Sequence, residues 1–348
     1  MTMGNEVGAV PGEGGSNSSS ILAKSVLFES NDKALVVIDI PRSLEESQVL
    51  SFQAPGRRIV SAEPPATPYA TPEPRHGVDY SSQALSSPAA QLAELMTTAA
   101  VQSALEDLAS TYPGPWHLAR FLEPQPPLIS GLPPHIPAKA EHLCGSIQEL
   151  RESFNASAPS FDLVVLDPPW PNRSARRRTN KYAMVQNLNE MRRLMLDIPI
   201  ASHLSPDGLV AVWITNKPSI HDFLVSPTGL FAAWGLEVVT EWTWVKVTTS
   251  GEPLYDVESV WRKPWEKLVI AKRRGSKSPD SLKPKIIMAV PDVHSRKPNL
   301  RGLFQDILEE GYLGLEVFAR SLTAGWWGWG DQVLHFQQAE HWSSIDNV

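Results

Sequence analysis

The fold is decided by residues 161–170, which read Phe-Asp-Leu-Val-Val-Leu-Asp-Pro-Pro-Trp. The mostly apolar run 161–166 is typical of a strand that is buried on both faces of a parallel sheet. Residues 167–170 predict a turn, because proline cannot donate to the hydrogen-bond ladder of a strand. In parallel sheets, ligands bind beyond the carboxyl ends of the strands. The turn at Asp167 therefore stands where a ligand site is expected.

From residue 140 onward the apolar pattern alternates between strands and helices. A helix is predicted at 299–310, with Leu300, Leu303, Phe304 and Ile307 facing inward. Further strands are predicted at residues 209–214, 236–247, 267–272, 286–290, 315–318 and 333–336. This alternation predicts an α/β fold, with a largely parallel sheet and helices on both faces. We assign residues 140–340 to one domain.

The region before residue 140 has a different composition. It contains more than half of the 31 prolines but only one of the 12 tryptophans. Residues 1–20, rich in Gly and Ser, are expected to be disordered. Residues 21–139 form an N-terminal region with Pro-rich linkers, a short strand at 34–40 and one helix at 89–109. Four residues of that helix share one face, which we expect to pack inward: Leu92, Leu95, Met96 and Ala99.

Overall composition narrows the class of protein. The chain has 348 residues, a formal net charge of −7 and a single cysteine, Cys144. One cysteine excludes a disulfide framework and a cysteine-based zinc cluster. The sequence lacks a run long and apolar enough to cross a membrane, so we expect no membrane. We also expect no metal, because the chemistry considered below does not need one. The negative charge argues against electrostatic coating of nucleic acid, but it allows an enzyme with one positive cleft. We expect a nuclear location, with the cytoplasm as a second possibility.

Asp167, Pro168, Pro169 and Trp170 are the candidate catalytic residues. An ordinary strand-ending turn would account for any one of them. Together they suit the exocyclic amine of adenine, a poor nucleophile that needs fixed hydrogen-bond acceptors. The Asp167 carboxylate and the Pro168 carbonyl can accept, and the two prolines stiffen the turn in advance. Trp170 offers a stacking face for a base that has left its stack.

Asp-Pro-Pro-Trp resembles the signature of the MT-A70 family of adenine N6 methyltransferases. The resemblance runs from about residue 142 to 338 and is nearest to the methyltransferase-like 4 branch. It is less specific at 34–44. The other matching motifs are Trp213-Ile214-Thr215-Asn216, Glu241-Trp242-Thr243-Trp244-Val245-Lys246, Lys263-Pro264-Trp265-Glu266, His294-Ser295-Arg296-Lys297-Pro298, Leu315-Glu316-Val317-Phe318-Ala319-Arg320 and Trp329-Gly330-Asp331-Gln332.

The resemblance implies a permuted Rossmann-like methyltransferase fold that uses S-adenosylmethionine. In this fold the catalytic motif precedes the strand that carries much of the cofactor site, which agrees with the lack of a Gly-x-Gly-x-x-Gly loop. By resemblance, the cofactor-binding residues are Gly145, Ser146 and Ile147 beside the adenine, Asp167, Lys297 near the methionine carboxylate, Glu316, Phe318, Arg320 and Thr323 along the adenosine, and Asp331 and Gln332 at the ribose or adenine.

Two positions depart from the family pattern. Asp331 stands where asparagine is usual, so an amide donor is replaced by a carboxylate that still accepts from ribose hydroxyls. Ser146 stands where an acidic residue is common. Neither departure touches the turn at 167–170, so an active enzyme is expected.

A basic run follows the turn. It contains Arg173, Arg176, Arg177, Arg178 and Lys181. A solvated loop or a nuclear-import signal would explain it, but its place beside the turn favours a clamp for phosphate groups. Asn172 is expected to orient the substrate. Trp242, Trp244 and Lys246 share one strand face, so Lys246 is a further candidate substrate-binding residue.

The combined expectation is a nucleic-acid N6-adenine methyltransferase. The branch resemblance implies RNA as the partner, specifically an internal 2'-O-methyladenosine of a small nuclear RNA. DNA is the alternative substrate. A non-catalytic subunit that binds nucleic acid is the alternative from another class, and a methyltransferase for a small planar amine or amide is a third. We expect a monomer, with a partner subunit as the alternative.

Overall fold

Ten strands form one sheet, in the order β1-β2-β9-β7-β8-β6-β5-β10-β11-β4. The computed structural model describes residues 24–50, 53–70, 87–122, 132–171, 185, 187–259 and 262–344. The predicted disorder at 1–20 and the basic run at 173–181 lie outside these residues. The ten strands are β1 (Val26–Glu29), β2 (Leu35–Ile38), β4 (Glu141–Cys144), β5 (Phe161–Leu166), β6 (Leu204–Ile214), β7 (Leu236–Lys246), β8 (Trp265–Arg273), β9 (Lys285–Ala289), β10 (Gly314–Val317) and β11 (Trp327–Gly330).

The sheet is mostly parallel, as predicted. Strand β8 is antiparallel to both β6 and β7, and β1 is antiparallel to β2. All other neighbouring strands run parallel. A second, two-stranded sheet pairs β3 (Arg57–Ile59) with β12 (Trp342–Ser344).

The order of the central strands is that of the permuted fold. Strand β5 lies between β6 and β10, and it precedes β10 by about half of the sequence. The register pairs Val165 with Glu316 and Leu166 with Val317. Since both strands run in the same direction, their carboxyl ends meet at one edge of the sheet. Residues that follow β5 and β10 are thereby brought together.

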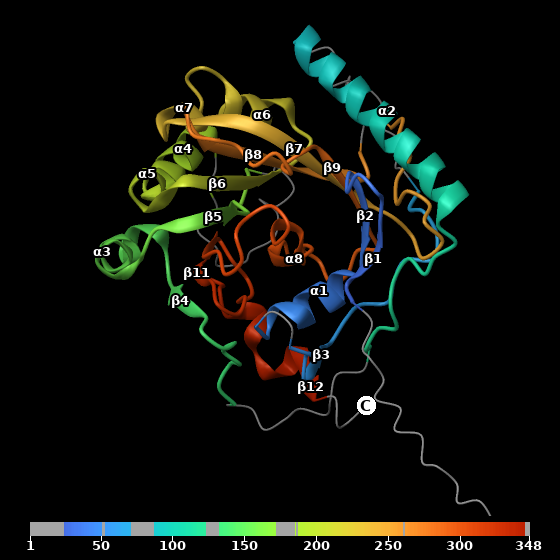
Figure 1. Ribbon diagram of the computed structural model, residues 1–348, viewed down its shortest axis with the longest axis horizontal. Helices are drawn as coiled ribbons and strands as arrows, with labels where there is room; N and C mark the ends of the chain where they lie inside the picture. Colours follow the sequence, from blue (N-terminus) through green and yellow to red (C-terminus); the bar gives the residue numbers. More distant parts are fainter. Residues whose placement is uncertain are drawn as a thin grey trace, which may run out of the picture.

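Helices cover both faces of the sheet, which curves around α1 and α8 (Figure 1). One face packs against the helices after β4 to β6, through Phe154, Met191 and Leu224. The opposite face packs against α1 and α8 through Leu44 and Phe304. The helices are α1 (Ile40–Ser47), α2 (Pro88–Thr111), α3 (Ile147–Ser157), α4 (Leu188–Leu196), α5 (Ile200–His203), α6 (Pro218–Val225), α7 (Leu230–Ala233) and α8 (Arg301–Phe304). Within the described residues, none of them is long and apolar enough to cross a membrane.

Two predicted elements differ from the structure. Within the helix expected at 299–310, only the four-residue α8 is helical. It is followed by turns, one of which is closed by the Ile307 N–H donating to the Phe304 carbonyl at 3.0 Å. Residues 333–336, expected as the last strand, form turns that lead into a 3₁₀ helix at His335–Gln337. Val333 is fully buried there, so an apolar run that fills the core from a turn was mistaken for a strand.

Helix α2 exists at the predicted place but buries a different face. Its buried residues are Thr98, Val101, Ala104 and Leu108. The face that was expected to pack is exposed, with side chains 59% (Leu92), 64% (Leu95) and 65% (Met96) accessible, and Ala99 is exposed too. Only the second half of the helix rests on the sheet, against residues such as Val247 and Met288. The first half extends beyond it (Figure 1).

The N-terminal region is joined to the sheet. Strands β1 and β2 precede residue 140 and yet form one end of the sheet. A buried ion network adds a second connection. The Asp292 carboxylate accepts from Arg296 Nη1 (2.7 Å) and from the Ala62 N–H (2.8 Å), and lies 3.7 Å from Arg120 Nη1. The side chains of these three charged residues are 0–2% exposed.

This network predicts a large stability difference between two aspartates. Asp292→Ala should lower the free energy of unfolding by about 3–5 kcal/mol, because it leaves two arginines buried without their carboxylate. The control is Asp306→Ala, whose carboxylate is 58% exposed and paired with the exposed Lys33. It should cost less than about 1 kcal/mol. Urea unfolding measures both, and equal losses would show that Asp292 is not a structural centre.

Candidate functional site

Asp167 begins a rigid turn at the carboxyl end of β5. Its N–H donates to the Val317 carbonyl of β10 at 3.3 Å, and the Trp170 N–H donates to the Pro168 carbonyl at 2.8 Å. The Trp170 indole N–H donates to the Trp213 carbonyl at 2.8 Å. Its ring meets Phe223 edge-to-face, with centroids 5.9 Å apart. One of these bonds closes the turn on itself, and the other two bonds and the ring contact hold it against neighbouring strands and a helix.

A chain of ion pairs leads away from Asp167. The Lys297 ammonium lies 3.4 Å from Asp167 Oδ1 and 2.8 Å from Glu266 Oε2. The other oxygen of Glu266 accepts from Lys246 Nζ at 2.5 Å. Lys297 also lies over the rings of Trp213 and Trp244, 5.3 and 5.8 Å from their centroids. Charges from four separate segments thus meet beside two tryptophans.

The pKa shifts follow from this arrangement. Burial raises the pKa of Asp167, although Lys297 opposes the shift. Burial alone would raise the pKa of Glu266, but Lys297 and Lys246 outweigh it and lower that pKa to about 2. Burial alone would lower the pKa of Lys297, but Asp167 and Glu266 hold it above its usual value. Lys297 therefore stays charged, and it is already shared between two carboxylates.

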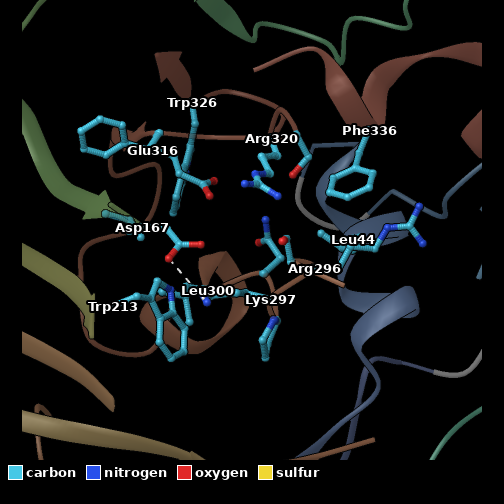
Figure 2. Close-up of a pocket in the computed structure, with 16 residues that line it drawn as sticks. Leu44, Asp167, Trp213, Arg296, Lys297, Leu300, Glu316, Arg320, Trp326 and Phe336 are labelled. Atoms are coloured by element: carbon cyan, nitrogen blue, oxygen red, sulfur yellow. Dashed lines mark ion pairs between the residues drawn. The ribbon is translucent and has the colours of Figure 1, made fainter. Parts of the chain in front are cut away.

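Glu316 lies beside Asp167 without a cation of its own at contact distance among the described ion pairs. Burial, with the Asp167 carboxylate, raises its pKa to about 7. Glu316, Asp167 and Arg320 point into the same cavity, with Lys297 below them (Figure 2). The lining of this cavity thus combines two carboxylates, Asp167 and Glu316, with three cations, Arg296, Lys297 and Arg320.

Two connected spaces meet at the turn. The inner cavity, of about 40 Å³, holds a few water molecules at most and is lined by Glu316, Asn299 and Trp326. An open cleft of about 1620 Å³ contains Pro168, Pro169 and Trp170. The residues that border both spaces are Asp167, Trp213, Ser295, Arg296, Lys297, Phe318 and Arg320.

Backbone strain also concentrates here. Phe318 has φ of 62° and Ser295 has φ of 75°, in the left-handed region that side chains other than glycine rarely adopt. Phe318 is held by its N–H, which donates to the Trp329 carbonyl at 2.7 Å. A Cβ added to Gly330 would lie 3.2 Å from Phe318 Cα, so glycine permits this close approach. Such strain at the border of a cavity is typical of functional sites.

The predicted adenine-side residues line the cleft at the start of α3. Ser146 caps the helix in a capping box with Glu149, and Gly145 and Ile147 flank it. Asp331 and Gln332 follow β11 and line the same part of the cleft. Partial burial and the Glu149 carboxylate raise the pKa of Asp331.

Other predicted residues lie elsewhere. Thr323 lines neither space, since it is buried and its hydroxyl accepts from Asn299 Nδ2 at 2.8 Å. It therefore supports Asn299, which lines the inner cavity. Lys246 lines the cleft as expected. The proposed substrate residues outside the described part of the chain are Asn172, Arg173, Arg176, Arg177 and Arg178.

Glu266 was not among the predicted site residues. The signal was present, because β7 and β8 are antiparallel and pair Trp244 with Glu266. Lys246 is two residues along, so the lysine and the glutamate are diagonal neighbours on one face. Among the described residues, no group of three or more His, Cys, Asp or Glu side chains is arranged to hold a metal ion.

Comparisons with known proteins agree with this geometry. The MT-A70 family pattern matches residues 161–332. An N6-methyladenosine RNA methyltransferase MTA1 from Cryphonectria parasitica is 49% identical over 328 residues, covering 92% of this chain and 94% of that protein. The MTA1 of Pyricularia oryzae is 43% identical over 369 residues, covering 92% and 97%. The mouse N(6)-adenine-specific methyltransferase METTL4 is 33% identical over 223 residues, covering 61% and 45%.

The matched segment begins with β5 and ends just after β11, so it contains both strands that carry the site. The relatives from the two fungi extend the similarity over almost the whole chain. The chain belongs to the MT-A70 family.

Proposed function

We propose that this chain transfers a methyl group from S-adenosylmethionine to the N6 amine of an adenine in RNA. The observation that carries the proposal is the position of the Asp167–Trp170 turn. Asp167 borders both a small, charged inner cavity and a cleft of about 1620 Å³, and the rest of the turn lines the cleft. The first space suits part of a small cofactor, and the second is large enough for a polymeric substrate.

The residues around the turn fit S-adenosylmethionine. When bound, this cofactor supplies an electrophilic methyl group on a positively charged sulfonium. A cation is favourable beside Asp167 and Glu316, because burial raises the pKa of both carboxyl groups and a positive neighbour offsets that cost. Asp331 and Gln332 offer acceptors for ribose hydroxyls, and Phe318 offers an apolar wall.

Lys297 fits the methionine carboxylate only in part. It already pairs with Asp167 and Glu266, so a third carboxylate would compete with two protein groups. Arg320, which also borders the inner cavity, is the second candidate for that anion. We therefore assign Lys297 first to Asp167, where it opposes the effect of burial on the carboxyl pKa.

Asp167 and Pro168 would hold the adenine amine. The carboxylate of Asp167 accepts an amine hydrogen and favours the pyramidal form, in which the nitrogen lone pair can attack. The Pro168 carbonyl accepts from the Trp170 N–H and keeps a second lone pair for the amine. Because the turn is fixed before substrate binds, little reorganisation is needed in the transition state. The ring of Trp170 lines the cleft and provides the stacking face.

RNA is the substrate class that the relatives favour. The two fungal relatives bear names that specify RNA, and they match over more than nine-tenths of this chain. The name of the mouse relative specifies only adenine. An internal 2'-O-methyladenosine of a small nuclear RNA is the finer proposal, and DNA is the alternative.

The charge of Asp167 should be essential for methyl transfer. Asp167→Asn should lower methyl transfer at least about 100-fold, because an amide replaces the charged acceptor without a change in size. Transfer of labelled methyl to matched RNA and DNA strands, with and without a 2'-O-methyl on the target adenosine, measures the effect. Asp306→Asn is the surface control. Undiminished N6 methylation by Asp167→Asn would remove the proposed mechanism.

The raised pKa of Glu316 predicts that stability depends on pH. The pKa of Glu316 rises from 4.5 to about 7 on folding, so its retained proton stabilises the ligand-free protein at low pH. That stabilisation is complete below about pH 4.5 and is lost as the pH rises through about 7. The free energy of unfolding should therefore fall relative to that of Glu316→Gln between about pH 5 and 8. Exposed Glu309→Gln is the control, and parallel curves for Glu316→Gln and wild type would contradict the assignment.

The basic run at 173–181 should contribute to the salt dependence of RNA binding. Replacing Arg176, Arg177 and Arg178 by alanine should reduce the slope of log affinity against log salt by about 2 for single-stranded RNA. The matched control replaces three exposed cations, Arg274, Lys277 and Lys283, which lie near the ends of β8 and β9 remote from the turn. Equal slopes for the run variant and wild type would leave the run as a loop or an import signal.

A further inference from the structure

One wall of the open cleft is formed by residues that are distant in sequence from the catalytic turn. It is lined there by Glu63, Pro65 and Tyr69, by the first half of α2, and by Leu254, Tyr255, Glu258, Arg262 and Lys263. Nothing in the methyl-transfer mechanism uses this wall. Its most distinctive feature is a pair of tyrosines, Tyr69 and Tyr255.

The two rings form an accessible aromatic surface. Their centroids are 5.7 Å apart, with the planes inclined at 65°, and Tyr69 is 50% exposed. The Arg262 guanidinium lies over the Tyr255 ring, 4.8 Å from its centroid. Aromatic faces with an adjacent arginine are the usual components of a stacking site for a nucleobase.

The backbone holds both tyrosines in place. The Tyr69 N–H donates to the Leu254 carbonyl at 2.9 Å, which fixes one ring against the other. An isolated antiparallel bridge between Val247 and Pro253 closes a loop. Within this loop the Thr249 N–H donates to the Pro65 carbonyl at 3.0 Å. Gly251 in this loop packs so closely on Trp116 that an added Cβ would lie 2.3 Å from the indole ring. The tyrosine surface is therefore preformed.

The same backbone connects this surface to the catalytic turn. The Leu254 N–H donates to the carbonyl of Lys246, at the end of β7. From Lys246 the ion pairs with Glu266 and Lys297 lead to Asp167. A nucleic-acid strand bound in the cleft would contact both the catalytic turn and the two tyrosines.

Local charges favour a base over a phosphate at this wall. The Lys263 ammonium is 3.1 Å from the Glu94 carboxylate, so its charge is offset. The Glu258 carboxylate accepts from the uncharged Gln102 Nε2 at 2.6 Å. Arg262 contacts an aromatic ring rather than a carboxylate in the described part of the chain. An uncharged flat group fits these neighbours better than a phosphate does.

We propose that Tyr69 and Tyr255, with Arg262, stack a nucleobase of the substrate strand outside the target adenine. The inference rests on the proposed function, since it assigns a second contact to the same nucleic acid. The N-terminal region thereby contributes directly to substrate binding, through Tyr69.

Paired variants test the stacking. Tyr69→Ala with Tyr255→Ala removes both rings, and Tyr69→Phe with Tyr255→Phe keeps them. Methyl transfer is measured on a single strand of about 16 nucleotides and on a short oligonucleotide with only the nearest neighbours of the target. The alanine pair should raise KM for the long strand about 5- to 150-fold. The kcat, the KM of the short strand and cofactor affinity should not change, and the phenylalanine pair should match wild type.

A fluorescent base gives a readout independent of turnover. The long strand carries 2-aminopurine at successive positions outside the target, and stacking on tyrosine should quench one position in wild type and the phenylalanine pair but not in the alanine pair. An unchanged KM for the long strand, with quenching unchanged, would overturn the proposal and point to a protein partner for this wall. Equal losses on both strands would overturn it in favour of a structural role. Failure of wild type to methylate any strand would instead refute the proposed function.

Discussion

The site depends on one lysine shared by two carboxylates. Lys297 reaches the site from the loop before α8, Asp167 from the end of β5 and Glu266 from the start of β8. Removing the lysine would leave two poorly hydrated carboxylates near each other, which costs several kcal/mol in a protein interior. The loop that carries Lys297 is accordingly anchored at Asp292 and Arg296, which bind the N-terminal region. The strained φ of Ser295 lies inside this anchored loop.

The resemblance assigned Lys297 to the methionine carboxylate, whereas the structure pairs it with Asp167 and Glu266. Lysine is a compact point charge, and the Lys297 ammonium pairs with the Asp167 and Glu266 carboxylates. It opposes the burial that raises the pKa of Asp167, the proposed acceptor for an amine hydrogen. Burial and the Asp167 carboxylate raise the pKa of Glu316 to about 7, although Lys297 opposes that shift too. Lys297 thus acts on both carboxyl groups, and among the described ion pairs it contacts only Asp167 of the two.

The extent of correct prediction follows from how strongly each pattern is tied to burial. Strand β5 was predictable, because strands buried on both faces are nearly continuous apolar runs. Strand β10, Gly-Leu-Glu-Val, was predicted although Glu316 interrupts its apolar run. Strand β11, Trp-Gly-Trp-Gly, was missed as a strand because its glycines serve close packing: a Cβ on Gly328 would lie 2.7 Å from Leu322. The apolar spacing of α2 revealed a periodic face but not which face meets the sheet, and the buried turn at Val333 imitated a strand. Glu266 was missed because its importance arises from pairing between strands.

The exposed half of α2 and the tyrosines fit one explanation for the N-terminal region. Strands β1 and β2 complete the sheet and Asp292 ties the region to the Lys297 loop, yet α2 leaves Leu95 open along the cleft. A chain of net charge −7 cannot attract a polyanion over its whole surface, so contacts that do not depend on charge become more important. Stacking on fixed aromatic rings is such a contact, because every base has a π-face and no phosphate need approach the acidic side chains. The N-terminal region then extends a cleft whose chemistry is confined to the ends of β5 and β10.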